Sequence, residues 1–321
     1  MSDLVQFSLG NRLKIKGNIQ TVGIIGCGSV GQVITRIIAQ HGMDVIFLDV
    51  SKKRIKEIFA DIETQLDDVI AHWGITPSEK KLILSRISGT TKMADLKDCD
   101  LVLETISSRQ KGTLIEMRQE LFKKVEKVVK KETIISSDLS TLMISDLSKV
   151  LKHPERSIGL HFIEPIDKTT IVEVVRGLKT SDEVYEKTVR FLKMINRNAV
   201  SINESPGNIS TRMLIPLINE ACEILMEGVA SVPDIDETMK ETTGYVYGPF
   251  EIADRIGLDK ILKYMDNLFQ EFGDKKYKAS PIIKRLVRAN YLGVQTCKGF
   301  YNYCNKHGKP IGNTISCAII H

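Results

Sequence analysis

The chain has 321 residues, of which 42% are hydrophobic and 26% are charged, and its formal net charge is +5 at neutral pH. This length favours two domains over one. Basic residues are spread along the chain without forming the stripe that binds nucleic acid, and no apolar run is long enough to cross a membrane. We therefore expect a globular protein without nucleic-acid or membrane partners.

Six cysteines lie far apart in the sequence, without a CxxC pair or a cysteine and histidine cluster of zinc spacing. This pattern predicts free thiols in a reducing compartment and no metal site. Residues 1–17 lack the apolar core of a signal peptide. We expect a cytoplasmic protein.

Short apolar runs alternate with helical patterns over the first half of the chain. Strands are predicted over residues 21–26, 44–50, 100–106 and 132–138. Helices are predicted over residues 33–42, 51–74, 76–87 and 114–131. Thr76, Pro77 and Glu79 have the spacing of a capping box with proline at the first helical position. Strands that alternate with helices predict an α/β protein with a doubly wound parallel sheet.

The pattern changes at residues 205–210, "SPGNIS". Beyond them helices are predicted, and apolar residues of the first one recur at helical spacing: Met213, Leu214, Leu217, Ile218, Ala221, Cys222 and Leu225. The predicted boundary separates an N-terminal α/β domain, residues 1–204, from a C-terminal all-helical domain, residues 205–321. The apolar faces of the second domain exceed one small core, so we expect a homodimer joined through this half.

Residues 26–31 form a GxGxxG pattern, Gly26-Cys27-Gly28-Ser29-Val30-Gly31, between a predicted strand and a helix. Gly26 would allow a tight turn, Gly28 would let a pyrophosphate approach the backbone, and Gly31 would let helix and strand pack closely. The helix N-terminus at Ser29 and Val30 offers N–H donors to phosphates. The motif predicts a Rossmann-type dinucleotide-binding domain; a plain strand-turn-helix without a ligand is the alternative.

Asp49 ends the next predicted strand, where its carboxylate would accept hydrogen bonds from ribose hydroxyls and repel a 2′-phosphate. Basic residues lie nearby and would favour the 2′-phosphate of NADP: Lys52, Lys53 and Arg54. We expect NAD in preference to NADP.

Two apolar runs each contain one polar side chain that needs a partner if it is buried. "GLHFIEP", residues 159–165, contains His161, and "IVEVV", residues 171–175, contains Glu173. In an antiparallel hairpin centred on Asp167 these two residues face each other. A carboxylate on one imidazole nitrogen fixes the tautomer and stabilises the imidazolium, so the other nitrogen can act as a general base. A buried structural pair is the alternative.

Ser140 follows the strand predicted over residues 132–138, at the carboxyl edge where open α/β sheets bind ligands. Its hydroxyl is a candidate for the active site. The alternative is a helix cap for the segment "LMISDLSKVL".

From about residue 20 to residue 303 the sequence resembles the L-3-hydroxyacyl-CoA dehydrogenases, including 3-hydroxybutyryl-CoA dehydrogenases. The resemblance is carried by the glycine loop, "SSDLSTLMISDL", "GLHFIEPIDKTTIVEVVRG", "PGNISTRMLIPLINEACEIL", "GYVYGPFEIADRIGLD" and "KGFYNY". It implies a Rossmann domain with a helical dimerisation domain, NAD as cofactor and an acyl-CoA substrate. It also implies a catalytic His161 and Glu173, an active-site Ser140, a substrate contact at Thr211 and a cofactor contact at Glu104.

Several positions depart from the motifs usual in that family. Asp138 replaces the asparagine of S-N-T-S, Glu164 that of HFFNP, and Thr211 that of PGFIxNR. After Glu104, the segment "SSRQKGTLIEMR" is longer than usual and brings Arg118 near the position of a family lysine. Thr211 keeps a hydroxyl donor. Asp138 and Glu164 add negative charge beside the acyl group, which favours a different or cationic substrate.

The leading hypothesis is an NAD-dependent oxidoreductase that interconverts a 3-hydroxyacyl thioester and its 3-oxoacyl form. One alternative is a dehydrogenase of a related hydroxy acid, free or bound to a carrier protein. The other is a non-catalytic NAD-binding homologue.

Overall fold

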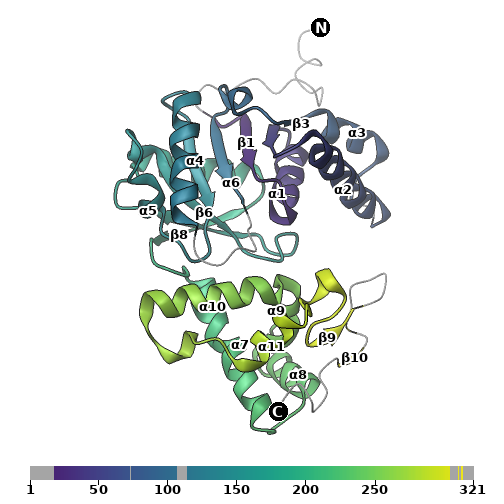
Figure 1. Cartoon of the computed structure of the whole chain (residues 1–321). Helices are drawn as coiled ribbons and strands as arrows, with labels where there is room; N and C mark the ends of the chain where they lie inside the picture. Colours follow the sequence, from purple (N-terminus) through teal and green to yellow (C-terminus); the bar gives the residue numbers. More distant parts are fainter. Residues whose placement is uncertain (1–17, 73, 107–113, 304–309, 311, 314–321) are drawn as a thin grey trace. The chain divides into compact units, whose positions relative to one another are not determined.

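The computed structural model describes residues 18–72, 74–106, 114–303, 310, 312 and 313 (Figure 1). These residues form two compact units. The first unit extends to Glu204, except that Ser140–Leu142 belong to the second unit, which otherwise begins at Ser205.

The first unit is built on an eight-stranded sheet with the order β3-β2-β1-β4-β5-β6-β7-β8. The strands are β1 Thr21–Ile25, β2 Asp44–Leu48, β3 Ile87–Thr90, β4 Leu101–Glu104, β5 Ile134–Asp138, β6 Ser157–Phe162, β7 Ile171–Arg176 and β8 Asn198–Asn203. Neighbouring strands are parallel except for β6 and β7, which are antiparallel. The strand order reverses beside β1, whose neighbours are β2 and β4, as in a doubly wound sheet. The predicted Rossmann-type fold is confirmed.

Helices and short 3₁₀ turns connect these strands. They are α1 Ser29–Gln40, α2 Lys52–Ala71, α3 Pro77–Ser85, η1 Met93–Leu96, α4 Ile115–Val128, α5 Ile144–Ser148, η2 Pro154–Arg156 and α6 Asp182–Met194. The predicted capping box of α3 is present, because the Glu79 amide donates to the Thr76 side chain and the Thr76 amide donates to Glu79. The helix expected after Ser140 is much shorter than the ten-residue segment in which it was predicted, since α5 begins at Ile144.

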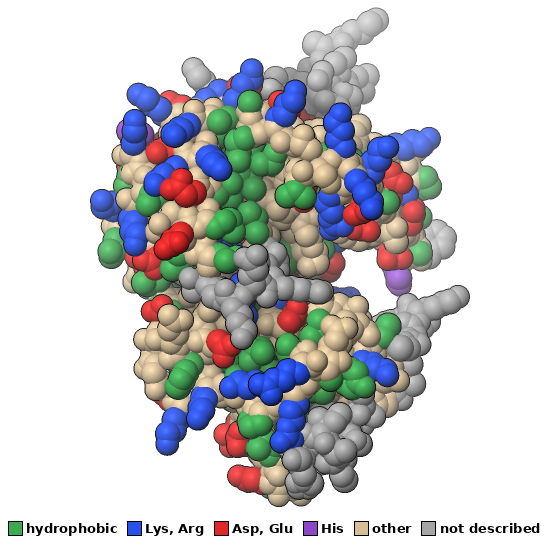
Figure 2. Space-filling view, viewed as in Figure 1, with side chains coloured by type: hydrophobic (Ala, Val, Ile, Leu, Met, Phe, Trp, Pro, Cys, Tyr) green, Lys and Arg blue, Asp and Glu red, His purple; other side chains and the backbone are tan. Residues whose placement is uncertain are grey.

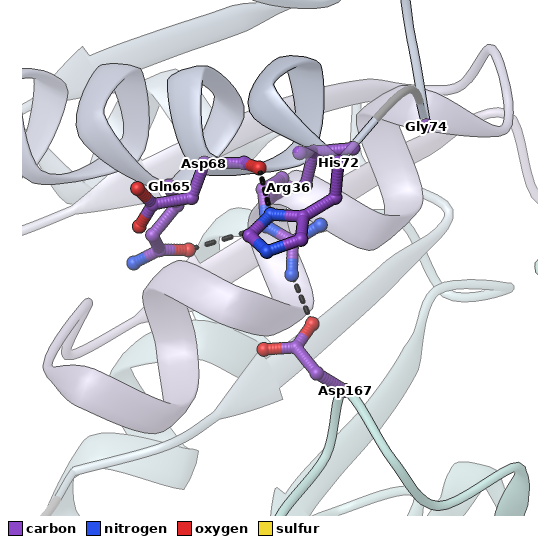
Figure 3. Close-up of a pocket in the computed structure, with 7 residues that line it drawn as sticks. Arg36, Gln65, Asp68, His72, Gly74 and Asp167 are labelled. Carbon is purple, nitrogen blue, oxygen red and sulfur yellow. Dashed lines mark hydrogen bonds and ion pairs between the residues drawn. The ribbon is translucent and has the colours of Figure 1, made fainter. Parts of the chain in front are cut away.

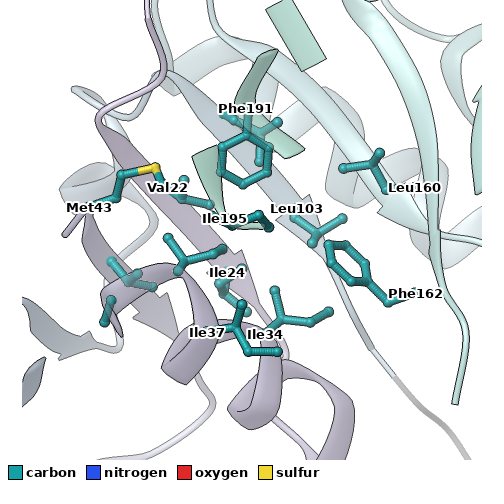
Figure 4. Packing of buried hydrophobic residues seen from close by; sticks show 14 of the residues in the cluster. Val22, Ile24, Ile34, Ile37, Met43, Leu103, Leu160, Phe162, Phe191 and Ile195 are labelled. Carbon is teal, nitrogen blue, oxygen red and sulfur yellow. The ribbon is translucent and has the colours of Figure 1, made fainter. Parts of the chain in front are cut away.

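Side-chain alternation on β6 and β7 decides which residues enter the core. Ile158, Leu160 and Phe162 of β6 lie in one buried cluster with Val172 and Val174 of β7. Figure 4 shows Leu160 and Phe162 among other apolar residues of this cluster. The others labelled there are Val22, Ile24, Ile34, Ile37, Met43, Leu103, Phe191 and Ile195. Because successive strand residues point to opposite faces, the residues between them on β6 and β7 point to the other face of the sheet.

The second unit consists of five α-helices, two short 3₁₀ helices and two short strands among the described residues. They are α7 Ser210–Met226, α8 Val232–Thr243, α9 Pro249–Ile256, α10 Leu258–Phe272, η3 Lys275–Tyr277, α11 Pro281–Arg288, η4 Val294–Thr296, β9 Tyr301–Asn302 and β10 Gly312–Asn313. A separate apolar cluster forms its core, to which the first helix contributes Ile215, Ile218, Ala221, Cys222 and Leu225. The antiparallel pair of β9 and β10 is the one non-helical feature here that the sequence pattern did not indicate.

A buried carboxylate fixes residues 300–303 to α9. Asp254 Oδ1 accepts from the Phe300 amide at 2.9 Å, and Oδ2 accepts from the Tyr301 amide at 2.9 Å and the Tyr303 hydroxyl at 3.0 Å. Burial raises the pKa of Asp254 to about 7, and the three donors act against that rise. The three hydrogen bonds therefore replace the water that the Asp254 carboxylate loses on burial.

We expect Asp254→Asn to lower the free energy of unfolding by about 2–3 kcal/mol, because the amide offers one acceptor oxygen and turns an NH₂ group toward buried donors. Urea denaturation followed by circular dichroism measures the change. Tyr303→Phe is the matched control, since it removes one donor and should cost about 1 kcal/mol. An Asp254→Asn variant at least as stable as Tyr303→Phe would contradict this role.

Candidate active site

The glycine loop joins β1 to α1 and leaves open space above its centre. Gly26 has a φ of +84°, in the left-handed region, as the tight turn requires. A Cβ at Gly31 would lie 2.7 Å from Thr105 Oγ1, so close packing excludes a side chain there. A Cβ at Gly28 would meet no atom within 4 Å. The backbone is thus open at the N-terminus of α1, where Ser29 begins the helix, and the loop fits a pyrophosphate.

Asp49 lies directly after β2, beside the glycine loop. Its amide donates to Thr90 O at 3.0 Å, and its Oδ1 accepts from the Val50 amide at 2.8 Å. The Gly26 amide donates to Leu48 O at 3.1 Å, so the glycine loop lies beside the end of β2 that Asp49 follows. The position suits a ribose contact. Of the nearby basic residues, Arg54 is paired with Glu57 at 3.2 Å.

Glu104, at the carboxyl end of β4, belongs to a buried cluster next to the loop. Its Oε1 accepts from the Ile106 amide at 2.7 Å, and its Oε2 accepts from Arg118 Nη1 at 2.5 Å and from the Ser137 hydroxyl. Arg118 Nη2 also donates to Ile106 O at 2.7 Å. This cluster ties β4, β5 and α4 together. The ion pair between Glu104 and Arg118 was not predicted, since fourteen residues separate the two in the sequence.

The hairpin prediction is confirmed by the register of β6 and β7. His161 is paired with Glu173 across the antiparallel strands. Its Nδ1 lies 2.7 Å from Glu173 Oε2, and the two side chains are 10% and 3% exposed. With Nδ1 bound to the carboxylate, Nε2 is the ring nitrogen that can exchange a proton with a ligand. The pair therefore has the chemistry of an oriented general base.

An ion pair holds the turn between these two strands. Asp167, the centre of the hairpin, accepts from Arg36 Nη2 of α1, and Arg36 is itself 5% exposed. Figure 3 shows this pair in a pocket of about 290 Å³, in which a dashed line also joins the His72 ring to Asp68. The residues that line the pocket are Arg36, Gln65, Asp68, Val69, His72, Gly74 and Asp167. The contact fixes the hairpin to the helix that follows the glycine loop.

Asp138 ends β5 and reaches across to β6. Its Oδ1 accepts from the Phe162 amide at 3.0 Å. Burial raises the pKa of Asp138 to about 6; the neighbouring His161 lowers it, and Glu164 and Glu104 raise it further. The sequence marks Asp138 as a departure from a motif, but its hydrogen bond to β6 becomes apparent only in the fold.

The two remaining candidates belong to the second unit. The Ser140 hydroxyl donates to the Tyr264 hydroxyl of α10 at 3.0 Å. It does not cap α5, whose cap position is occupied by Met143. Thr211 is the second residue of α7 and is 5% exposed. Tyr264 carries no motif in the sequence, so its contact with Ser140 could not be predicted.

The unusual segment after Glu104 lies largely in residues 107–113, outside the described residues. Within the described residues, no group of three or more His, Cys, Asp or Glu side chains converges as a metal site. No helix in that part of the chain is both long and apolar enough to cross a bilayer.

Comparison with known proteins agrees with the resemblance noted in the sequence. Two family models match the chain: 3-hydroxyacyl-CoA dehydrogenase, NAD binding domain, over residues 21–205, and 3-hydroxyacyl-CoA dehydrogenase, C-terminal domain, over residues 207–303. The first agrees with NAD as the predicted cofactor.

Similar proteins cover nearly the whole chain. A 3-hydroxybutyryl-CoA dehydrogenase of Bradyrhizobium diazoefficiens is 37% identical over 293 residues, which is 91% of this chain and 98% of that protein. One of Clostridioides difficile is 36% identical over 282 residues, 88% of this chain and 99% of that protein. The crystal structure of (S)-3-hydroxybutyryl-CoA dehydrogenase from Ralstonia eutropha is 35% identical, with a TM-score of 0.80 over 90% of this chain and 100% of that chain. The chain therefore belongs to the 3-hydroxyacyl-CoA dehydrogenase family.

Proposed function

We propose that this protein interconverts a 3-hydroxyacyl-CoA and the corresponding 3-oxoacyl-CoA with NAD, and that His161 is its general base. The observation that carries the proposal is the buried pair of His161 and Glu173, 2.7 Å apart in the unit that holds the glycine loop. A histidine oriented by a carboxylate is the arrangement that proton abstraction from an alcohol requires.

In the oxidative direction, His161 accepts the proton of the substrate hydroxyl at Nε2. Glu173 holds the ring by Nδ1 and stabilises the imidazolium that forms. When bound, NAD is the acceptor of the hydride that leaves the carbinol carbon. In the reverse direction, His161 returns its proton to the carbonyl oxygen. Both side chains are buried, so the charge that develops on the ring is met by a carboxylate rather than by water.

Ser140 and Thr211 complete the proposed machinery. Each carries a hydroxyl that can hydrogen-bond a substrate oxygen, and each occupies the position that the family's motifs give to such a contact. Ser140 is oriented by Tyr264 at 3.0 Å. In Thr211 a hydroxyl stands where the family uses an amide, so the donor is retained and its reach is shortened.

The cofactor site follows from the first unit. The Gly28 amide donates to Gly26 O at 2.8 Å, so the backbone N–H groups of Ser29 and Val30, in the first turn of α1 beside the open space at Gly28, would bind the pyrophosphate. Asp49 would accept from the adenosine ribose. Glu104 supports this site by holding Ile106, whose atoms a side chain at Gly26 would strike.

A second candidate substrate is a related hydroxy acid that is not attached to CoA but is free or bound to a carrier protein. The departures at Asp138 and Glu164 are what raise the question of the substrate, although their negative charge favours a different or cationic substrate over a free acid anion. Oxidation of NADH with acetoacetyl-CoA, compared with acetoacetate at equal concentration, separates the two substrates. Turnover with neither would favour a non-catalytic NAD-binding homologue.

We further propose a cytoplasmic homodimer. Cys27, Cys99 and Cys222 are buried thiols whose pKa values burial raises to about 12, as suits a reducing compartment. Figure 2 shows hydrophobic side chains on the surface of the second unit. Its exposed large apolar residues are Ile209, Met213, Val229, Tyr245, Val246, Phe269 and Phe272. Such surface is typical of a subunit interface.

The dyad is tested by His161→Gln and Glu173→Gln. The first keeps a donor for the buried carboxylate but removes the base, so turnover should fall by about two to four powers of ten. The second keeps an acceptor but removes the charge, and the two effects should be less than additive in the double variant because both act through one imidazole. Steady-state kinetics and thermal melting measure both properties.

The control is the surface pair of His153 and Glu155, 3.1 Å apart and about half exposed. His153→Gln changes the same residue type in the same kind of pair and should leave turnover intact. Wild-type turnover by folded His161→Gln would leave the buried pair with a structural role alone.

Cofactor choice is tested by titrating the protein with NADH and with NADPH and following their fluorescence. NADH should bind several-fold more tightly, because the Asp49 carboxylate repels a 2′-phosphate. Asp49→Asn should narrow the difference by removing that repulsion. Equal affinities in the wild type would refute the assignment.

Assembly is tested by sedimentation at micromolar concentration. The wild type should have twice the chain mass of 36.0 kDa. Met213→Glu places a charge on the exposed apolar surface of the second unit and should favour the monomer. Leu178→Glu, at a residue 89% exposed in the first unit, is the matched control and should leave the mass unchanged. A wild-type monomer would contradict the proposal.

A further inference from the structure

Two side chains of α10 bind the segment Ser140–Leu142, which follows β5. The Ser140 hydroxyl donates to the Tyr264 hydroxyl at 3.0 Å, and the Asn267 amide donates to Thr141 Oγ1 at 2.9 Å. Tyr264 and Asn267 are three residues apart on the helix, so they lie on one face of it. The segment and α10 both belong to the second unit. These contacts therefore attach the candidate active-site serine to that unit.

The ring of Tyr264 is held by packing. It lies against the apolar core of the second unit, in which Ile261, Met265 and Leu268 of the same helix are fully buried. A tyrosine side chain has only two torsions, so packing of the ring also fixes where its hydroxyl lies. The Ser140 hydroxyl is thus bound by a group that has little freedom to move away from it.

The two contacts differ in their access to a ligand. Thr141 and Asn267 are 7% and 6% exposed, so their hydrogen bond is a buried structural contact. Ser140 and Tyr264 are each part-buried, and a ligand oxygen can approach their hydroxyls. The cap position of α5 is occupied by Met143, so the Ser140 hydroxyl does not serve that helix.

The chemistry of a hydroxyl pair decides what Ser140 can offer a substrate. A hydroxyl has one proton to donate and can accept two hydrogen bonds, and it rotates to suit its partners. A serine whose proton points at Tyr264 cannot donate to a second oxygen. When the tyrosine donates to Ser140 Oγ instead, the serine proton is directed at the substrate, and the two hydrogen bonds polarise and strengthen each other.

We propose that Tyr264 is a positioning residue that acts through Ser140: its hydroxyl donates to Ser140 Oγ and directs the serine proton at the reacting oxygen of the substrate. The inference rests on the proposed function and deepens it. In reduction, negative charge develops on the substrate oxygen before His161 protonates it, and the hydroxyl pair stabilises that charge. The protons of Ser140 and Tyr264 stay on their own oxygens throughout.

Tyr264→Phe is the direct test, because it keeps the packed ring and removes the hydroxyl. In the reduction of acetoacetyl-CoA by NADH, kcat should fall by about tenfold, the effect of one hydrogen bond to a developing charge. KM for NADH should stay unchanged, since the glycine loop belongs to the first unit. An unchanged kcat in folded Tyr264→Phe would overturn the inference.

Replacement of Tyr264 by 4-aminophenylalanine tests whether a donor is what matters. This side chain keeps the ring and places an N–H donor where the hydroxyl was, so kcat should lie above that of Tyr264→Phe and below that of the wild type. If Tyr264→Phe fails to fold, the same variant is compared with the wild type alone. Loss of kcat as large as that of Ser140→Ala in the amino variant would contradict the role of a donor.

A double-mutant cycle with Ser140→Ala tests whether Tyr264 acts through the serine. Once the serine hydroxyl is gone, Tyr264→Phe, or the amino variant in its place, should lower kcat little further. A role of Tyr264 in packing alone would lower kcat by the same factor with and without the serine hydroxyl, and that result would overturn the inference.

Asn267→Leu is the matched control on the same helix face. It removes the other contact between α10 and the segment, so thermal melting should show a loss of stability while kcat stays near that of the wild type. A loss of kcat equal to that of Tyr264→Phe would assign the effect to attachment of the segment and not to the hydroxyl pair, which would refute the inference.

Failure of this inference and failure of the proposed function give different results. Wild-type turnover that Tyr264→Phe leaves intact would refute the role of Tyr264 and leave the dehydrogenase unaffected. A wild type that reduces neither acetoacetyl-CoA nor acetoacetate would refute the proposed function, and the inference with it, because Ser140 would then meet no reacting oxygen.

Discussion

The antiparallel register of β6 against β7 is the constraint on which the candidate site depends. Leu160 and Phe162 on one strand, and Val172 and Val174 on the other, are buried in the same apolar cluster. A slip of one residue would turn these side chains out of that cluster, to the opposite face of the sheet. The hydrophobic residues thus fix the position of His161 opposite Glu173. The base is oriented by the core, not only by its hydrogen bond.

Charged side chains buried in the first unit are compensated within it. Arg118 meets Glu104 and His161 meets Glu173 in buried pairs, and the buried Arg36 meets Asp167, whose side chain is 55% exposed. Each pair links elements that are distant in sequence, so each fixes a loop or strand that would otherwise be held by apolar packing alone. Removing one partner of such a pair leaves an uncompensated charge, whereas an apolar pair of similar size can be equally stable. Pairs of this kind therefore fix the positions of the elements they join, and they need not add to the free energy of unfolding.

Patterns that depend on neighbouring residues were predictable, and contacts set by the fold were not. The glycine loop, the capping box at Thr76 and the hairpin at Asp167 each have a fixed spacing that implies one local geometry. β3 and β8 were missed because they are edge strands, β3 only four residues long and β8 partly polar, "NAVSIN". Edge strands of this kind lack the apolar run that marks a central strand.

The site shows the same division. The pairing of His161 with Glu173 follows from sequence symmetry about the turn. The hydrogen bond between Asp138 and the Phe162 amide depends instead on β5 lying next to β6, and that adjacency follows from strand order. The resemblance placed Arg118 near the position of a family lysine, whereas its ion pair with Glu104 depends on the packing of α4 on the sheet.

Helix α1 sets the distance between the glycine loop and the turn between β6 and β7, so its length should tolerate few insertions or deletions. Its first residue, Ser29, adjoins the glycine loop, and Arg36, two turns later, binds the hairpin turn at Asp167. The two points are about 10 Å apart along the helix at 1.5 Å per residue. Inserting one residue between them would rotate Arg36 by about 100° and remove it from the turn. Homologous proteins that keep this contact should accept substitutions in that interval far more readily than changes in its length.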